Sequence, residues 1–259
     1  MKKIITLSVL FLLSCSAPVQ KVCEPLSFEA LTDLTLLEKF FRTSEEDVIR
    51  ARDVVIRHGL IRNLSHLKKM NSGGTKYYLL ERENITEMIN AVTAGVYLDY
   101  IIINSGGDII YTKSNNDIFG NNVNTGFNDT PVRKCFYSRE GVHFEDVDML
   151  THSSNVLGLY VSVPVITEGA YQGSLILQID IAGINRLFDS YTDIISREGT
   201  IRVTENRGRI LSPYHAFSEI DFECLDRNRS WTTGNSEKHV NYSLFNYKNI
   251  SWIIAREYL

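Results

Sequence analysis

The chain has 259 residues, of which 44% are hydrophobic, 22% charged and 10% aromatic. This composition is typical of a globular protein and excludes a disordered or fibrous chain. The formal net charge is -4 and no basic run occurs, so the chain lacks an electrostatic footprint for nucleic acid and we expect no such partner.

Residues 1–14 have the pattern of an export signal. Two lysines precede an apolar run from Ile4 to Leu13, which is too short for an ordinary membrane-spanning helix. The run ends in Leu12-Leu13-Ser14-Cys15, which resembles the bacterial lipobox, whose Cys is lipidated and becomes the mature N-terminus. We therefore expect a lipid on Cys15, although a generic signal peptide with a chance Cys would show the same residues.

A lipid on Cys15 would hold the protein to the cell membrane or outer membrane, facing the periplasm or the cell exterior. Each buried methylene contributes about 0.8 kcal/mol to such anchoring. Loss of the two lysines leaves 25 basic and 31 acidic residues, a net charge of -6, which does not favour anionic lipid. No later segment approaches the roughly 20 apolar residues that cross a bilayer.

The remaining cysteines, Cys23, Cys135 and Cys224, match no metal-ligand spacing. An extracytoplasmic location permits disulfides, so we expect structural roles or a single disulfide, with the pairing left open.

After a tether over residues 15–27, the pattern predicts a helical stalk over residues 28–70. Apolar residues recur at helical spacing from Phe28 to Phe41. Ser44 followed by Asp47 is a capping signature and predicts the start of a second helical stretch. The Asn71-Ser72-Gly73-Gly74 segment predicts its end, so a single helix over 44–70 would extend about 40 Å.

Residues 71–190 are expected to form a first sheet module. A helix is predicted from about Tyr77 to Val92 and a short one over 130–139. Period-two alternation and turn residues predict strands at 96–103, 108–111, 142–147, 157–166 and 174–181. The polar loop 112–128 usually would only connect, but it is long enough to cover a pocket as a lid.

Residues 191–259 repeat part of this order. Strands at 201–204 and 209–211 flank a turn at Gly208 that lines up with the turn at Gly107, and strands at 240–245 and 251–257 repeat the pair around Gly173. Unrelated hairpins also look alike, but the order as a whole indicates two similar modules. The sequence therefore predicts an α+β fold, in which a long N-terminal helix precedes two antiparallel-sheet modules, the second abbreviated.

This order resembles the extracellular double Cache sensor domains of bacterial chemoreceptors and sensor kinases, over roughly residues 28–259. The most specific pieces are Ile101 to Tyr111 with the following Asn116-Asp117-Ile118-Phe119-Gly120, and Val161-Ser162-Val163-Pro164-Val165 running on to Leu177-Gln178-Ile179-Asp180. The resemblance implies two PAS-like modules, with a ligand in the first, membrane-distal one. Family members usually continue into a transmembrane helix and an output domain, whereas this chain stops at Leu259, so we expect a separate transmembrane signalling protein as partner.

The resemblance also implies a ligand site. Amino-acid-binding members use an Arg on a helix, an aromatic-x-Asp on a strand and an Asp at the end of a later strand. The counterparts here are Arg133, Phe144 with Asp146, and Asp180. Each also has a simpler interpretation, because Arg133 suits a solvated helix surface, Asp146 a strand-end turn and Asp180 a helix cap.

Strand alternation predicts that Phe144 and Asp146 share one face, and that Gln178 and Asp180 share one face. An Arg fork suits a carboxylate, paired Asp side chains attract an ammonium, and Phe144 with Tyr97 or Tyr111 would wall the apolar part of the ligand. The expected ligand is therefore an amino acid, an amine or an organic acid.

The sequence favours a lipid-anchored Cache-type binding protein that needs no cofactor and is not an enzyme. No nucleophile-elbow, zinc-protease or phosphate-loop motif occurs, and the six His form no metal-ligand pair. The alternative is a structural or adhesive surface lipoprotein that has kept the fold and lost the pocket. Ligand-induced thermal stabilisation would separate the two hypotheses.

Overall fold

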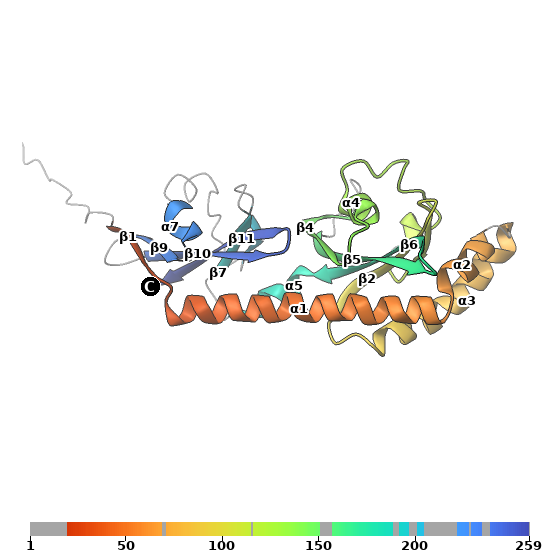
Figure 1. The fold of residues 1–259 in the computed structure, drawn as a ribbon, viewed down its shortest axis with the longest axis horizontal. Helices are drawn as coiled ribbons and strands as arrows, with labels where there is room; N and C mark the ends of the chain where they lie inside the picture. Colours follow the sequence, from red (N-terminus) through yellow and green to blue (C-terminus); the bar gives the residue numbers. More distant parts are fainter. Residues whose placement is uncertain are drawn as a thin grey trace, which may run out of the picture.

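The computed structural model describes residues 20–68, 71–114, 116–150, 157–188, 192–196, 201–204, 222–227, 229–234 and 239–258. The molecule is elongated, and its two sheets lie one after the other along a single long helix (Figure 1). The expected signal peptide, the lipidated Cys15 and the strand expected at 209–211 lie outside the described residues.

Helix α1 (Phe28–Arg57) forms the axis of the molecule. It has 30 residues, which corresponds to about 45 Å. Ser27 caps its N-terminus, because the Ser27 side chain accepts a hydrogen bond from the Ala30 amide at 3.1 Å. Its buried apolar residues recur on one side of the helix and include Leu37, Phe41, Val48, Ala51 and Val55.

The expected helix start at Ser44 is wrong, because α1 continues through this position. The Ser44 side chain is buried and its hydroxyl donates to the Phe40 carbonyl at 3.0 Å, one turn earlier. A serine that bonds back in this way satisfies its hydroxyl inside a helix and does not cap one.

The long helix ends at Arg57, just before Gly59, and not near residue 70. Gly59 has φ 57°, a left-handed conformation that glycine adopts without steric strain. Helix α2 (Leu60–Lys68) begins directly after it, and α3 (Asn71–Asn90) packs against α2. The Asn-Ser-Gly-Gly segment that predicts a helix end thus begins α3, because packing overrides weak local propensity.

The first sheet has five antiparallel strands in the order β3-β2-β6-β5-β4. One of its faces packs on α1, and the other is covered by α4 and by the loop that precedes α4. The sequence predicts its strands and α4, with differences only at their ends, but it does not predict η1, which lies in the segment expected to be a polar loop. The elements are β2 (Tyr97–Asn104), β3 (Ile109–Thr112), η1 (Asn116–Ile118), α4 (Pro131–Tyr137), β4 (His143–Met149), β5 (Leu157–Thr167) and β6 (Ala170–Asp180).

The polar loop before α4 is anchored to the sheet by its few apolar residues. Val123 and Phe127 are buried in the same cluster as Ile101 and Ile176 of the sheet. The loop therefore completes the core on the α4 side of the first sheet.

The second sheet has six strands in the order β1-β9-β10-β11-β7-β8. Apart from β1, this order repeats that of the first sheet strand for strand, which confirms the expected α+β fold with two similar modules. The β7–β8 pair takes the place of β2–β3, so residues 201–204 form the second strand of this hairpin and not the first. The elements are β1 (Gln20–Pro25), α5 (Ile181–Asn185), β7 (Thr192–Ser196), β8 (Ile201–Thr204), α7 (Phe222–Asp226), β9 (Arg229–Gly234), β10 (His239–Tyr247) and β11 (Ile250–Tyr258).

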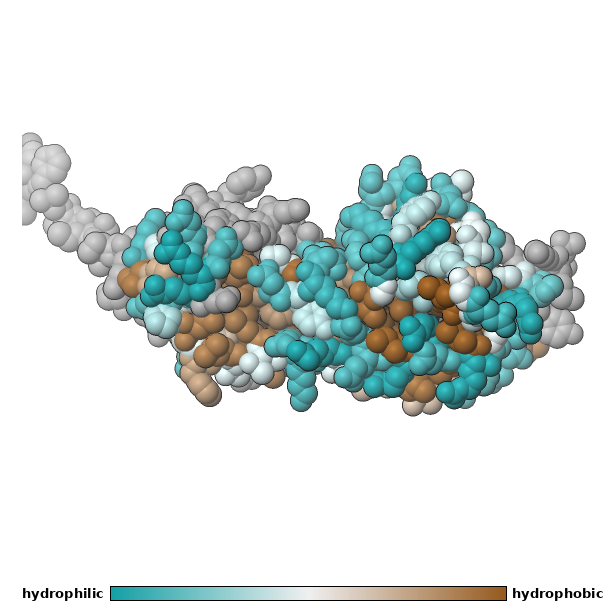
Figure 2. All heavy atoms as spheres, viewed as in Figure 1, coloured by the Kyte–Doolittle hydropathy of each residue, from teal (hydrophilic) through white to brown (hydrophobic). Residues whose placement is uncertain are grey.

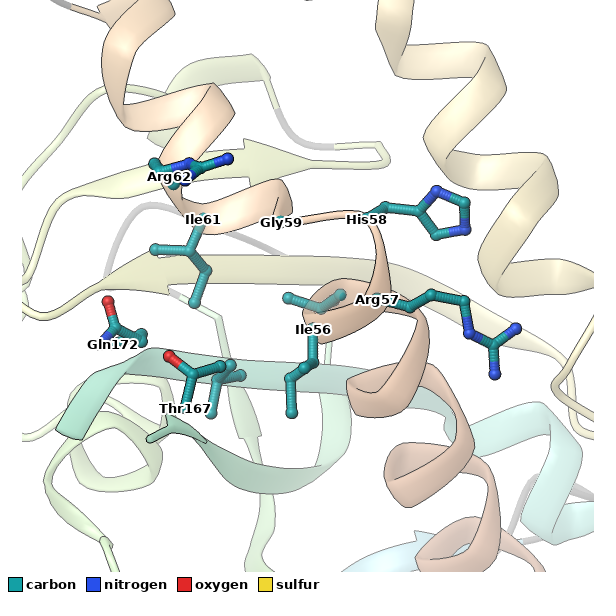
Figure 3. A pocket seen from close by; sticks show the side chains of 10 residues that line it. Ile56, Arg57, His58, Gly59, Ile61, Arg62, Thr167 and Gln172 are labelled. Carbon is teal, nitrogen blue, oxygen red and sulfur yellow. The ribbon is translucent and has the colours of Figure 1, made fainter. Parts of the chain in front are cut away.

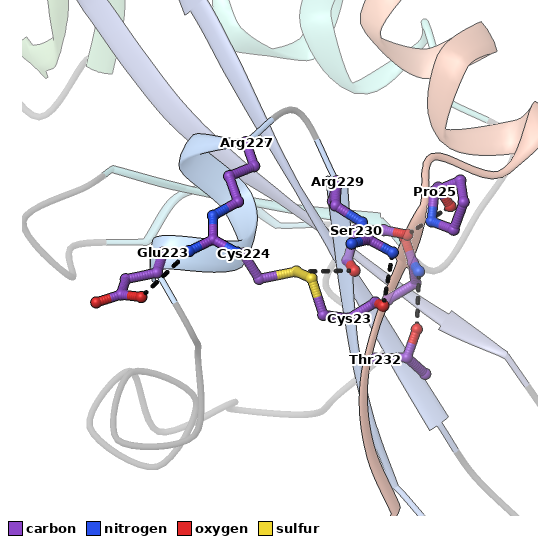
Figure 4. Close-up of a disulfide and its surroundings, with 9 residues drawn as sticks. Cys23, Pro25, Glu223, Cys224, Arg227, Arg229, Ser230 and Thr232 are labelled. Carbon is purple, nitrogen blue, oxygen red and sulfur yellow. Dashed lines mark hydrogen bonds and ion pairs between the residues drawn. A yellow bond between two sulfur atoms is a disulfide. The ribbon is translucent and has the colours of Figure 1, made fainter.

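Part of the segment expected to be a tether is an edge strand of the second sheet. Strand β1 pairs antiparallel with β9, and a disulfide joins Cys23 of β1 to Cys224 of α7, 201 residues later (Figure 4). The Arg229 guanidinium donates to the Cys23 carbonyl at 3.1 Å, and the Ser230 hydroxyl donates to the Pro25 carbonyl at 3.2 Å. Cys135 is a buried free thiol.

The two modules share a hydrophobic core around Phe41. The Phe41 ring lies 5.1 Å from Phe144 of the first sheet, and 5.4 Å from Phe245 and 5.3 Å from Trp252 of the second. Figure 2 shows hydrophobic side chains gathered over each module on one face of the molecule, with polar side chains between them. No helix in the described ranges is long and apolar enough to span a membrane.

Candidate ligand-binding site

Three of the expected site residues, Tyr97, Tyr111 and Phe144, lie on the α1 side of the first sheet. All three are buried in the large core cluster. The Tyr97 hydroxyl donates to the Asp47 carboxylate at 2.7 Å, and the Tyr111 hydroxyl lies 2.6 Å from that of Thr86. These side chains fill the space between the sheet and the helices, and the two tyrosine hydroxyls make their hydrogen bonds within this core.

Asp146 lies near Phe144, at the contact between the modules. Its Oδ1 accepts a hydrogen bond from the indole nitrogen of Trp252 at 2.9 Å. Strand β4 is the edge of the first sheet and contacts β11, so this side of β4 faces the second module. A buried indole usually needs such an acceptor, which gives Asp146 a structural partner.

Arg133 lies on α4, on the opposite side of the first sheet. Thr130 caps this helix and accepts a hydrogen bond from the Arg133 amide at 3.4 Å. The half-buried guanidinium donates to the Asn128 side chain and lies 5.6 Å from the centre of the Tyr137 ring. Arg133 is therefore held at the surface of α4 by its own loop and helix.

Asp180 is the last residue of β6 and pairs with Gly158. Gln178, two residues earlier, shares its face by strand alternation. The Gln178 amide nitrogen lies 3.3 Å from the hydroxyl oxygen of Tyr160, and both side chains are buried. Because Tyr160 packs with the α4 residues, this face looks towards α4.

The structure thus separates the six expected ligand residues into two groups. Arg133 and Asp180 lie on the α4 side of the first sheet, whereas Phe144, Asp146, Tyr97 and Tyr111 lie on the α1 side or at the module contact. Alternation predicts which residues of one strand share a face. It does not predict which of the two faces packs against α1 and which packs against α4.

Tyr160 is a candidate that the sequence analysis missed. It lies directly opposite Gln178 in the β5–β6 register. The sequence feature that could have pointed to it is its position as the one tyrosine in a strand of mostly aliphatic residues. Burial raises the pKa of its hydroxyl, so the group stays neutral, and it donates a hydrogen bond to the Asp148 carbonyl at 3.3 Å.

Two other kinds of site, a reactive cysteine and a metal centre, have little support at this face. Burial raises the pKa of the Cys135 thiol, which keeps it protonated and a poor nucleophile. Within the described part of the chain, no group of three His, Cys, Asp or Glu side chains could hold a metal ion.

No family model matches the sequence, and no curated protein matches it. The extracellular ligand binding receptor from Desulfohalobium retbaense is similar in structure, with a TM-score of 0.57 and 11% identity, over 90% of this chain and 40% of that one. The ligand-binding domain of the Campylobacter jejuni chemoreceptor Tlp3, in complex with 4-methylisoleucine, has a TM-score of 0.54 and 9% identity, over 88% of this chain and 86% of that one.

A domain of a sensory box/GGDEF family protein from Vibrio parahaemolyticus is also similar, with a TM-score of 0.51 and 11% identity, over 87% of this chain and 97% of that one. Identities this low establish the fold and not the ligand. The chain has the double Cache fold of bacterial extracellular sensor domains.

Proposed function

We propose that this chain is an extracytoplasmic sensor, held to a membrane by a lipid on Cys15, that binds a small solute in its first module and signals through a separate transmembrane partner. The lipobox residues support the anchor, and the receptor fold supports the sensor role. The observation that carries solute binding is the buried Tyr160–Gln178 pair on the α4 side of the first sheet.

This pair suits a polar ligand for a physical reason. The Tyr160 hydroxyl accepts a hydrogen bond from the Gln178 amide and donates one to the Asp148 carbonyl at 3.3 Å, so the two side chains form a fixed polar surface in an otherwise apolar face. A hydrophobic pair would have filled this space without the cost of burying polar groups, so a polar surface here suits a polar ligand. Asp180 continues the same face and carries a negative charge that attracts an ammonium group. Arg133 on α4 lies on the same side of the sheet and would suit a carboxylate. The proposed ligand is therefore an amino acid or an amine, and Tlp3 has been solved with such ligands.

The contact between the modules supports a route for the signal. Asn249, in the β10–β11 turn, bonds to both backbone polar groups of Phe144 on β4. Lys248 and Tyr247 of the same turn each donate to the Glu45 carboxylate of α1 at 2.7 Å. A displacement of β4 would therefore act on the second module and on α1 together.

Ligand binding is tested by thermal shift and isothermal titration against L-amino acids and amines. Asp180→Ala should weaken binding by at least about tenfold, because it removes a charge-assisted hydrogen bond. Tyr160→Phe should weaken it as well, whereas the matched variant Tyr111→Phe loses an equally buried hydroxyl on the other side and should keep full affinity. Full affinity in both site variants, or no ligand in the panel, would contradict the proposal and favour a structural lipoprotein.

The anchor is tested separately by Cys15→Ala. This variant should leave the membrane fraction for the soluble fraction, because no lipid can be attached. Unchanged partitioning in detergent phase separation would show that Cys15 carries no anchor.

A further inference from the structure

A hollow of about 390 Å³ lies on the α1 side of the first sheet, at the end of the molecule away from β1 (Figure 3). It is enclosed by the end of α1, the Gly59 turn, the start of α2 and the tip of the β5–β6 hairpin. Its volume lies at the small end of the range for ligand pockets. The sheet separates it from the Tyr160–Gln178 pair, since Val165 in its wall belongs to the α1-facing core.

The floor of the hollow is apolar and its rim is polar. Val55, Ile61 and Val165 form the buried floor. Thr167 and Gln172 contribute a hydroxyl and an amide on the hairpin side. No acidic residue is among the residues that line the hollow, so the lining does not suit a cation.

Arg62 supplies positive charge at the rim. Its side chain is exposed and makes no ion pair or hydrogen bond within the described ranges, and Figure 3 shows it at the edge of the hollow above Ile61. Arg57 also borders the hollow, but its side chain is directed away from it. A guanidinium presents its donors as a fork that matches a carboxylate. The first turn of α2 contains no acidic residue that would oppose an anion there.

We propose that this hollow binds a small carboxylate with an apolar body. The carboxylate pairs with Arg62, and the hydrocarbon part lies on Val55, Ile61 and Val165. This combination of one guanidinium and an apolar floor favours a short monocarboxylate over a phosphate compound, which would require several more donors.

Isothermal titration of the purified full-length chain with hexanoate tests this site. Hexanoate should bind saturably, and 1-hexanol, which has the same chain length but no charge, should bind at least about tenfold more weakly. Arg62→Ala should weaken hexanoate binding by at least about tenfold. Arg57→Ala is the matched control, because it removes an exposed arginine that points away, and it should retain the wild-type affinity.

Three results would overturn the proposal. They are the absence of saturable hexanoate binding, equal affinity in Arg62→Ala and the wild type, and loss of hexanoate binding in Asp180→Ala, which would place the ligand on the α4 side. The site is independent of the proposed sensor function, since Arg62→Ala should leave amino-acid or amine binding unchanged. The Arg57 and Arg62 side chains are both exposed, so Arg57→Ala and Arg62→Ala should fold like the wild type. Circular dichroism of the two variants checks that they are folded.

Discussion

Asp47 is a fully buried carboxylate in the middle of α1 that holds the start of the first sheet. Its oxygens accept hydrogen bonds from the Ala94 amide at 2.9 Å, the Gly95 amide at 2.8 Å and the Tyr97 hydroxyl at 2.7 Å, and it pairs with the Arg50 guanidinium. The sequence pattern assigns this residue to a helix cap. It instead satisfies two backbone donors of a turn some 47 residues later in the chain.

Asp47→Asn should lower the free energy of unfolding by about 3 kcal/mol. The amide keeps the shape but loses the charge and turns two of its own donors towards groups that already donate. Urea unfolding measures the loss. Asp53→Asn is the control on the same helix, because the Asp53 side chain is 52% exposed, and its effect should stay within about 0.5 kcal/mol. Equal losses in the two variants would refute the assigned role.

At the scale of the elements, β1 is the edge strand that connects the N-terminal segment to the second module. Its ladder with β9 and the Cys23–Cys224 disulfide hold together segments from opposite ends of the sequence. A crosslink between such distant residues restricts the unfolded chain strongly, which is the usual account of disulfide stabilisation.

A chain carrying both Cys23→Ala and Cys224→Ala should lose about 2–4 kcal/mol of stability. Dithiothreitol should lower the melting temperature of the wild type and leave that of the double variant unchanged. Cys135 is buried and its thiol pKa is raised, so it should not react with a thiol reagent in the folded protein. A double variant as stable as the wild type would show that the ladder alone holds β1.

The β10–β11 turn joins the second module to α1 through Glu45. Burial raises the pKa of the Glu45 carboxyl, but hydrogen bonds from Lys248 and Tyr247 outweigh this effect and hold the pKa below its ordinary value. A carboxyl with a lowered folded-state pKa stabilises the fold above its unfolded pKa of about 4.3, and this contribution is lost as the pH falls through the folded-state pKa.

Glu45→Gln should therefore cost about 1 kcal/mol at neutral pH, and the difference from the wild type should shrink below the unfolded pKa of about 4.3 and vanish once the pH has fallen through the lower folded-state pKa. Urea unfolding at several pH values measures it. Glu38→Gln, on the same helix with a side chain 49% exposed, should show no comparable loss. A difference that persists at low pH would mean that packing, and not charge, is what Glu45 contributes.

The whole molecule should unfold as one unit, because residues of both sheets share the core around Phe41. The two tryptophans, Trp231 and Trp252, both lie in the second sheet, whereas far-UV circular dichroism reports both modules. Urea transitions followed by tryptophan fluorescence and by circular dichroism should coincide. Separate midpoints would show that the modules unfold independently and would weaken the proposed route through β4.

The sequence by itself determined the local order of this protein. Alternating apolar residues and turn residues, mainly glycine and asparagine, placed the strands of the first sheet and the β10–β11 hairpin, and the repeated order indicated two modules. These features are local, because the period of two and the turn chemistry act over a few residues. The same period predicted that Gln178 and Asp180 share a face.

Only the tertiary structure decided which faces meet. Strand β1, the continuity of α1 through Ser44, and the division of the ligand candidates between the two sides of the first sheet all depend on partners far away in the chain. Phe144 and Tyr97 became core because α1 covers their side, and Asp146 became a partner of Trp252 because β4 contacts β11. Pairings between distant segments arise from the packing of whole elements, and they cannot be predicted from a pattern that extends over only a few residues.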